Sequence, residues 1–260
     1  MDPNDVTILI DSKDYSHQDA NEFTVQLDRE FRNVSALRIT YAGIPCTFYN
    51  ISRKLGNNYF AVSDGVSAYK YLTLPDGFYD IESFSRAFQK GYEKLNFGRY
   101  GISFDVQEST GKMLINFRKR SGRTPSLAVT DNNAELLGFN VSKGSRITLP
   151  RTVGGKTENP ALSDKPINFK PFEYFLVHCD IIDDSSVLYN GKRSSVLARF
   201  PVKKCDFGEI TTYNLSGSRG RKCDQSFNKI RLWVTDEANN PIDFNGANIQ
   251  YELLLQFSTK

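Results

Sequence analysis

Two adjacent residues, His178 and Cys179, are the pair in this sequence that most resembles a catalytic base and nucleophile. They lie in the alternating run Tyr174 to Ile182, which predicts a β-strand. Because neighbouring side chains on a strand point to opposite faces, these two cannot act on each other. Cys179 is therefore interpreted as a small core residue.

Metal ligands are sparse. His17 and His178 are the two histidines of the chain, so a two-histidine site would have to join distant segments. Asp180, Asp183 and Asp184 could hold Ca²⁺ or form a solvated loop. The loop interpretation is favoured because the glycine and final glutamate of a calcium-binding loop are missing. We expect no metal and no cofactor.

The four cysteines, Cys46, Cys179, Cys205 and Cys223, have irregular spacing and form no C-x-x-C pair. This pattern argues against zinc and against a dense disulfide framework. The N-terminal segment has no basic region ahead of its short apolar run, and no apolar run is long enough to span a membrane. The sequence therefore predicts synthesis in the cytosol and four free thiols.

Sequence motifs of common enzyme classes are absent, including the phosphate-binding loop, the nucleophile elbow and the zinc-protease helix. We therefore expect a protein that is not an enzyme. Its charge is nearly balanced, with 33 basic and 30 acidic residues, which does not indicate a general nucleic-acid binder.

Two short basic clusters stand out as candidate contacts for a partner. Both fall in segments predicted to be loops, and they consist of Arg118, Lys119, Arg120 and Arg123 in the first, and Arg219, Arg221 and Lys222 in the second. Solvated loops are the simpler interpretation. The alternative is contact with an acidic protein surface or with packaged DNA.

The elements that must position these residues are almost all strands. Ile230, Leu232 and Val234 alternate with polar residues, and five large apolar residues alternate from Ile249 to Phe257. This period of two predicts long antiparallel strands with one buried face. One clear helix is predicted, capped by Asp80, with an apolar stripe of Ile81, Phe84, Phe88, Tyr92 and Leu95.

Many short strands without alternating helices predict an all-β fold, a single jelly-roll β-sandwich with one short helix and long surface loops. Residues 1–21 are predicted to be an N-terminal arm, and residues 22–260 the jelly-roll domain. Within it, residues 142–172 are rich in Gly, Pro, Lys and Arg, which predicts a surface loop excursion.

With these segments assembled, the chain resembles a known family. The similarity is carried by F-T-V-Q-L, V-S-A-L-R-I-T-Y-A-G-I-P-C-T-F-Y-N-I, L-P-D-G-F-Y-D-I-E-S-F, T-G-K-M-L-I-N-F, N-N-A-E-L-L-G-F, F-L-V-H-C-D-I-I and R-L-W-V-T-D-E-A-N-N-P-I-D-F-N-G-A, spread over residues 22–257. The chain looks like the penton-type minor capsid proteins of Polinton or Maverick elements, adintoviruses and virophages.

This resemblance implies a homopentamer at the fivefold vertices of an icosahedral capsid in the virion, beside a double-jelly-roll major capsid protein. Some related adenoviral penton proteins carry an Arg-Gly-Asp integrin motif, whereas this chain has Arg219-Gly220-Arg221, so the resemblance does not extend to receptor binding by that motif. The alternative interpretation is a carbohydrate- or receptor-binding β-sandwich, such as a fibre head, in which exposed aromatic residues like Trp233 could contact a sugar.

Overall fold

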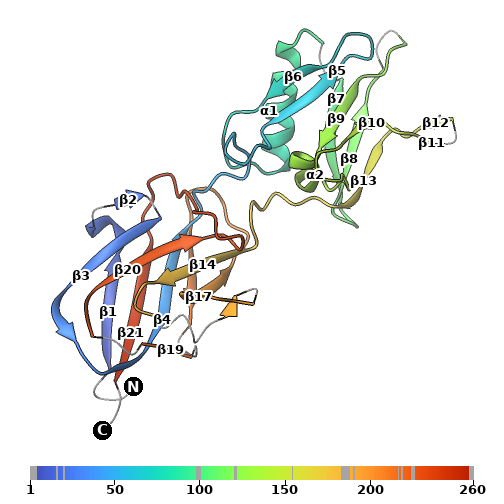
Figure 1. Ribbon diagram of the computed structural model, residues 1–260. Helices are drawn as coiled ribbons and strands as arrows, with labels where there is room; N and C mark the ends of the chain where they lie inside the picture. The colour runs from blue at the N-terminus through green and yellow to red at the C-terminus, as the bar shows by residue number, and fades with distance from the viewer. Residues whose placement is uncertain are drawn as a thin grey trace. The chain divides into compact units, whose positions relative to one another are not determined.

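Figure 1 shows the computed structural model of the chain, which describes residues 5–15, 17–19, 21–97, 101–119, 122–153, 155–182, 188–189, 191–215, 217, 219–223 and 226–257. The chain forms two compact units: unit 1 contains Met1–Phe48 and Phe172–Lys260, and unit 2 is the intervening segment Tyr49–Pro171. The sequence predicts one domain, but the structure divides the chain because the inserted segment buries an apolar core of its own.

The first sheet of unit 1 has the order β1-β21-β4-β18, and β19 also pairs with β4. All pairings within it are antiparallel. Its strands are β1 (Val6–Asp11), β4 (Val34–Pro45), β18 (Ile210–Asn214), β19 (Arg221–Lys222) and β21 (Gln250–Phe257).

The second sheet of unit 1 has the order β17-β14-β20-β3-β2. Its strands are β2 (His17–Asp19), β3 (Glu22–Phe31), β14 (Tyr174–Cys179), β17 (Val196–Pro201) and β20 (Phe227–Thr235). Ile230, Leu232 and Val234 are buried, as the alternation in β20 predicts. A separate two-stranded ribbon consists of β15 (Leu188–Tyr189) and β16 (Lys192–Arg193).

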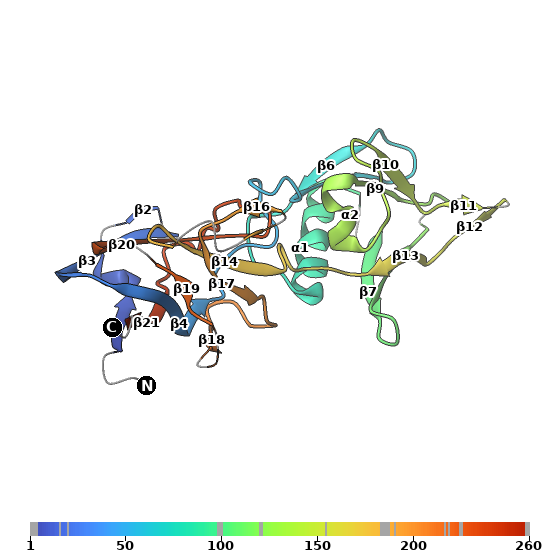
Figure 2. The same ribbon diagram turned by 60° about the horizontal axis from the view of Figure 1, so that its bottom comes forward.

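Aromatic side chains join the two sheets of unit 1. The rings of Phe23 on β3 and Tyr251 on β21 stack with centroids 6.4 Å apart. Phe200 on β17 contacts Tyr213 on β18 at 4.8 Å, and the Tyr213 hydroxyl donates a hydrogen bond to the Pro201 carbonyl (2.7 Å). The inner faces of two antiparallel sheets thus form one core, as in a β-sandwich. Figure 2 shows the strands of both sheets from a second side.

The closing strand β21 departs from simple alternation at one point. Its register with β4 shifts between Glu252 and Leu253, and the Thr40 hydroxyl donates to the Glu252 carboxylate (2.7 Å) at this bulge. Leu253 is buried as predicted, but Leu254, which the alternation places on the polar face, is buried as well. The predicted alternation therefore holds for Tyr251, Leu253 and Leu255, which are buried, and the difference is that the opposite face of β21 is buried as well at Leu254.

The N-terminal segment is part of the sheet, which corrects the prediction of an arm over residues 1–21. β1 pairs with β21 along its whole length, from Val6 opposite Leu255 to Asp11 opposite Gln250, and Ile10 is buried. A 3₁₀ turn, Ser12–Asp14, follows, and the Asp11 side chain accepts a hydrogen bond from the Lys13 N–H. The short apolar run had enough β-forming residues to pair once β21 was available.

Unit 2 contains two further antiparallel sheets. One has the order β10-β9-β5-β6 and the other β13-β8-β7. Their strands are β5 (Tyr59–Ser63), β6 (Lys70–Thr73), β7 (Ile102–Gln107), β8 (Lys112–Phe117), β9 (Ser126–Thr130), β10 (Arg146–Leu149) and β13 (Ala161–Pro166), with a small ribbon of β11 (Thr152–Val153) and β12 (Lys156–Thr157).

Four of these strands, β10 to β13, lie within residues 142–172, where the sequence predicts a surface loop excursion. That prediction was wrong. β10 pairs with β9 and β13 with β8, and both Leu149 and Ala161 are fully buried in the core of unit 2. The segment has few apolar residues, but those of β10 and β13 lie at positions that face the core. Its low mean hydropathy therefore did not indicate strands.

The main helix, α1 (Ile81–Lys94), packs against β7 and β6 and supplies Phe84, Phe88 and Tyr92 to the core. Asp80 caps it, accepting a hydrogen bond from the Ser83 N–H (2.7 Å), as the sequence predicts. Gly91 has a packing reason to be in the helix, because a Cβ there would lie 2.8 Å from Leu72 Cγ on β6. Gly138 ends the short helix α2 (Asp131–Leu137) in the left-handed conformation.

The two ends of the insertion are tied within their own units. In unit 1 the rings of Phe48 and Phe172 meet at 4.9 Å, and both contact Phe175. In unit 2 the Asn50 amide donates to the carbonyls of Tyr79 (2.7 Å) and Phe169 (2.9 Å). In each unit, these contacts hold together the two chain segments that lead into and out of the insertion.

One pair of cysteines is joined, which corrects the prediction of four free thiols. Cys46, just after β4, forms a disulfide with Cys205 in the segment before β18, while Cys179 and Cys223 are free and buried. Sequence spacing gave no sign of the pair because the two residues are 159 positions apart.

The predicted all-β, jelly-roll class is confirmed. In the part of the chain that the structure describes, no helix is long and apolar enough to cross a membrane.

The buried face of β21 gives a stability prediction with a matched control. Leu253→Asp should prevent folding or lower the free energy of unfolding by several kcal/mol, because it buries an unpaired carboxylate. Leu9→Lys, on the neighbouring strand with its side chain 73% exposed and opposite Glu252, should change it by less than about 0.5 kcal/mol. Denaturant unfolding followed by circular dichroism measures both. Equal losses in the two variants would contradict the assigned faces.

The disulfide gives a second prediction. After denaturation without reductant, two of the four cysteines should react with an alkylating agent, and all four after reduction. Reduction should lower the free energy of unfolding by up to about 5 kcal/mol, because the bond restrains a long loop of the unfolded chain. Mass spectrometry and thermal melting measure the two effects. Four reactive thiols without reductant, or an unchanged melting temperature, would contradict the bond.

Candidate assembly surfaces

The first basic cluster lies in unit 2. Arg118 and Lys119 follow the end of β8 and are exposed, and the Arg118 N–H donates to the Gly101 carbonyl (3.0 Å). Arg123 is exposed shortly before β9, and Arg120 lies outside the described residues. The backbone at Arg118 is therefore held by a hydrogen bond, while the side chains of Arg118, Lys119 and Arg123 are exposed.

The second basic cluster lies in unit 1, and its predicted loop is partly a strand. Arg221 and Lys222 form β19, paired with Leu37 and Ala36 of β4, and Arg219 is exposed just before it. Gly220 allows this close approach, since a Cβ there would lie 2.8 Å from Ala36 Cβ. Because the two clusters belong to different compact units, the structure does not bring them together within one unit.

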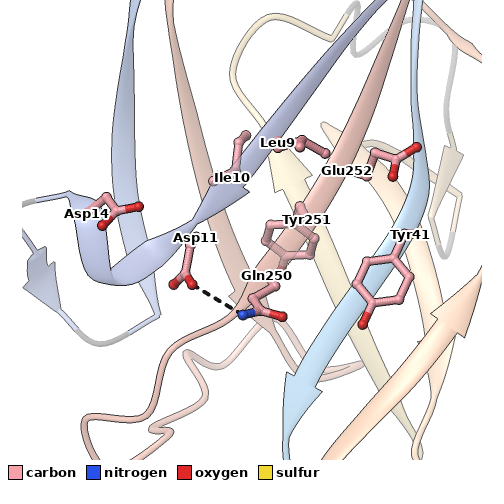
Figure 3. Close-up of a pocket in the computed structure, with 8 residues that line it drawn as sticks. All are labelled: Leu9, Ile10, Asp11, Asp14, Tyr41, Gln250, Tyr251 and Glu252. Carbon is pink, nitrogen blue, oxygen red and sulfur yellow. Dashed lines mark hydrogen bonds between the residues drawn. The ribbon is translucent and has the colours of Figure 1, made fainter.

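Unit 1 has a groove that the sequence did not predict. Figure 3 shows the residues that line it, on β1, β21 and β4. Its volume is about 480 Å³. We call it the acidic groove, and it is lined by Leu9, Ile10, Asp11, Asp14, Tyr41, Gln250, Tyr251 and Glu252. Leu9, Glu252 and Tyr41 are register partners, so they form one row across the three strands. Its acidic rim and apolar wall are features of a protein contact surface.

A glycine on β4 lies beside the groove-lining residues Tyr41 and Gln250. Gly43 on β4 pairs with Gln250, and a Cβ at this position would meet Ile210 Cγ2, Gln250 Oε1 and the Tyr41 hydroxyl at 3.3 to 3.4 Å. Side chains from neighbouring strands therefore converge above Gly43. A glycine inside a strand pattern is the one signal in the sequence that marks such a place.

Charge in the groove is predominantly negative. Burial tends to raise the pKa of Asp11, but the hydrogen bonds and charge of Lys13 and the amide of Gln250 hold it below its ordinary value. Lys13 pairs with Asp11 at 3.0 Å. Glu252 is fixed by the Thr40 hydroxyl, and Asp14 is exposed. Both rim residues Asp14 and Glu252 are placed to attract a positive group.

The residues that most resemble a catalytic pair are both buried. Cys179 is fully buried, as predicted, and burial raises the pKa of its thiol far above the ordinary value, which makes it a poor nucleophile. His178 stacks on Trp233 with the ring planes within 6° and the centroids 5.1 Å apart. This arrangement is that of a packed core and not of an open active site.

The imidazole of His178 has a defined hydrogen-bond pattern. The Thr235 hydroxyl donates to the Asp236 carbonyl (3.1 Å), so His178 Nε2–H is the donor to Thr235 Oγ1 (2.9 Å). His178 Nδ1 is then an acceptor for the Ser195 hydroxyl (3.4 Å). Burial lowers the pKa of His178 to about 4, so the ring is neutral at physiological pH.

Metal ligands do not gather in the part of the chain that the structure describes, where no group of three His, Cys, Asp or Glu side chains could hold an ion. Asp180 accepts a hydrogen bond from the Arg231 N–H (2.9 Å). Asp183 and Asp184, the other members of the acidic string, lie outside the described residues.

Comparison with known proteins gives a result for the fold. No protein-family model matches this sequence, and no curated protein is significantly similar to it. Among similar solved structures is the crystal structure of the selenomethionine-labelled mavirus penton protein, with a TM-score of 0.56 and 10% sequence identity. The match covers 98% of this chain and 100% of that one.

The chain has a penton-like fold. The similarity extends over both units, so the insertion between β4 and β14 is part of what the two structures share. At this sequence identity the likeness concerns architecture and not individual contact residues, so the clusters and the groove described above are features of this chain.

His178 predicts a dependence of stability on pH. Its pKa is about 4 in the folded protein and 6.5 ordinarily, so between these values the unfolded chain binds a proton that the folded protein does not. The free energy of unfolding should therefore fall with decreasing pH, by about 2 kcal/mol between about pH 7 and pH 5 from this residue. In His178→Gln this part of the dependence should be missing. Parallel curves for the two proteins, from urea unfolding, would contradict the prediction.

Proposed function

We propose that the protein is a structural capsid subunit, a penton that forms homopentamers at the fivefold vertices of an icosahedral DNA-virus capsid. The observation that supports this most directly is the likeness in fold to the mavirus penton protein over almost the whole of both chains. By this proposal the chain is not an enzyme. The buried positions of His178 and Cys179 agree with a role that depends on surfaces.

In this proposal the protein is a component of the virion, where its partners are other copies of itself and a double-jelly-roll major capsid protein. The exposed basic residues Arg118, Lys119 and Arg123 of unit 2 and Arg219 and Lys222 of unit 1 are candidate contacts with acidic surfaces or with packaged DNA. Such contacts between exposed charges weaken as salt is added, so they affect association more than folding.

The native mass of the purified protein tests the proposal. A homopentamer should have about five times the chain mass of 29.5 kDa, and co-expression with a major capsid protein should yield particles that contain it at vertices. Light scattering over a concentration series and electron microscopy of particles are the measurements. A protein that stays monomeric at high concentration and never joins particles would overturn the penton assignment.

One observation favours the second candidate, a carbohydrate- or receptor-binding module. Tyr71 and Tyr69 are 68% and 38% exposed on unit 2, and the ring of Tyr59 contacts that of Tyr71 (6.4 Å). The Asn132 amide, which donates to the Tyr59 hydroxyl (3.2 Å), adds a polar group beside them. Exposed aromatic rings next to amides suit sugar rings. A monomeric protein whose binding to glycans is lost in Tyr71→Ala would favour this function over the capsid role.

A further inference from the structure

The two compact units differ in the sign of their charge. Unit 2 has 18 basic and 11 acidic residues, a formal net charge of +7, whereas unit 1 has 15 basic and 19 acidic residues, a net charge of −4. The near balance of the whole chain therefore hides a basic unit and an acidic one. Charge that is divided in this way indicates a separate partner for the basic part, and polyanions such as nucleic acids are the partners that basic surfaces attract.

One sheet of unit 2 has an outer face with small residues at its centre. The inner face of the sheet β10-β9-β5-β6 supplies core residues, which are Phe60, Val62, Leu72, Leu127, Val129 and Leu149. Because side chains alternate along a strand, the residues between these point to the outer face. There Ala61 pairs with Tyr71 on one side and with Ala128 on the other, and Ala128 pairs with Thr148. Methyl groups therefore occupy the middle of the outer face, where larger side chains would fill it.

Tyrosine rings border these alanines. Tyr71 on β6 is 68% exposed, and Tyr69, just before β6, is 38% exposed. Tyr59, on β5 and two residues before Ala61, is half-buried, and its ring meets that of Tyr71 at an angle of 67°. We call the outer face around Tyr59, Tyr69 and Tyr71 the tyrosine face. Exposed aromatic rings gathered on one face of a sheet are more often a binding surface than a structural necessity.

Hydrogen bonds hold the tyrosine face in place before any ligand arrives. The Ser126 hydroxyl on β9 donates to the Tyr69 hydroxyl (3.0 Å), and β9 lies on the far side of β5 from Tyr69. The Asn132 amide donates to the Tyr59 hydroxyl (3.2 Å). Tyrosine side chains that are already fixed lose little conformational entropy when a ligand binds, which increases affinity.

Exposed arginines lie at two borders of the tyrosine face. Arg146 on β10 pairs with Thr130 of β9, which follows Ala128 by two positions and so shares its face. Arg123 is exposed beside Thr124, whose carbonyl oxygen would lie 2.3 Å from a Cβ at Gly65. Gly65 is in the connection between β5 and β6, so Arg123 lies at the end of the sheet where Tyr69 lies. Both guanidinium groups can therefore meet an anionic ligand that crosses the face.

The carboxylates near the tyrosine face are already bound by backbone N–H groups. Asp64 accepts hydrogen bonds from the N–H groups of Ser67 (2.7 Å) and Val66 (3.0 Å), which hold its pKa below the ordinary value. Asp131 accepts a hydrogen bond from the Gly144 N–H (2.7 Å). Because N–H dipoles compensate part of each negative charge, these carboxylates repel an approaching anion less than free ones would.

We propose that unit 2 binds single-stranded nucleic acid on the tyrosine face, with bases stacked on Tyr69 and Tyr71 and phosphates held by Arg123 and Arg146. A nucleic-acid strand uses both the rings and the positive charge of the unit, whereas a neutral sugar uses only the rings. Aromatic residues on a four-stranded sheet stack bases in the same way in RNA-recognition domains. Bases of a duplex are already stacked on one another, so the face selects single strands. This inference goes beyond the proposed capsid function and does not depend on it.

Replacement of the rings tests the stacking. The probe is a fluorescent oligothymidylate of about 20 nucleotides, and fluorescence anisotropy measures its binding to the whole chain. The alanine variant, Tyr69→Ala with Tyr71→Ala, should bind at least about tenfold more weakly, whereas Tyr69→Phe with Tyr71→Phe should stay within about threefold, because stacking needs the ring and not the hydroxyl. Leu162→Ala, at an exposed residue of β13 in the other sheet of unit 2, is the control and should bind normally. Thermal melting checks that each variant is folded.

Salt and strandedness test the rest of the proposal. Arg123→Gln with Arg146→Gln should reduce the slope of log affinity against log salt concentration by about 1, because each phosphate contact in a single strand contributes about 0.7. The same strand annealed to its complement should bind more weakly, and equally to the unmodified protein and the alanine variant.

The outcomes that overturn the proposal are distinct. They are oligonucleotide binding that is absent, binding that is unchanged in the folded alanine variant, and a duplex that binds as tightly as the single strand. Glycan binding that is lost in the alanine variant, in a protein that does not bind the oligonucleotide, would also overturn it and would assign the tyrosine face to carbohydrate.

Assembly is measured separately from nucleic-acid binding. The alanine variant should form pentamers and enter particles as the unmodified protein does, because the tyrosine face binds a strand and not another subunit. Loss of assembly with unchanged oligonucleotide binding would make the tyrosines a subunit contact and overturn the inference. A protein that binds the oligonucleotide through these tyrosines but stays monomeric and absent from particles would overturn the capsid function alone.

Discussion

Unit 1 depends on the pairing between β4 and β21. The pairing runs from Gly43 opposite Gln250 to Val34 opposite Phe257, and each strand holds further strands on its other side: β1 on β21, and β18 and β19 on β4. The two strands are separated by more than two hundred residues, so the sheet forms only after a large loop has closed. The acidic groove exists because this pairing places distant segments in one sheet.

The insertion between the strands is tolerated because its ends are secured on both sides of the boundary. Phe48 and Phe172 meet in unit 1, and Asn50 bonds to the chain near both ends of unit 2. Between them, unit 2 buries Phe60, Phe84, Phe88 and Phe117 in its own core. A segment that folds around its own core adds surface to the protein without weakening the sheet from which it departs.

The features of this chain that bear on function lie on its surfaces. His178 and Cys179, which have the chemistry of a catalytic pair, are packed inside a sheet and held by Trp233, Thr235 and Ser195. Exposed large apolar residues, in contrast, occur on both units, among them Leu9 and Ile210 on unit 1 and Tyr71 on unit 2.

The sequence by itself determined the local elements. Alternation placed the buried face of β20, spacing and Asp80 placed α1, and Gly111 between two apolar runs placed the β7–β8 hairpin. These features depend on a few neighbouring residues, so a local pattern is enough. Only the tertiary structure decided what depends on distant partners. The bulge between β4 and β21, the pairing of β1, the disulfide between Cys46 and Cys205 and the division into two units each join residues far apart in the chain. The acidic groove is the extreme case, because its walls come from three strands that are distant in the sequence.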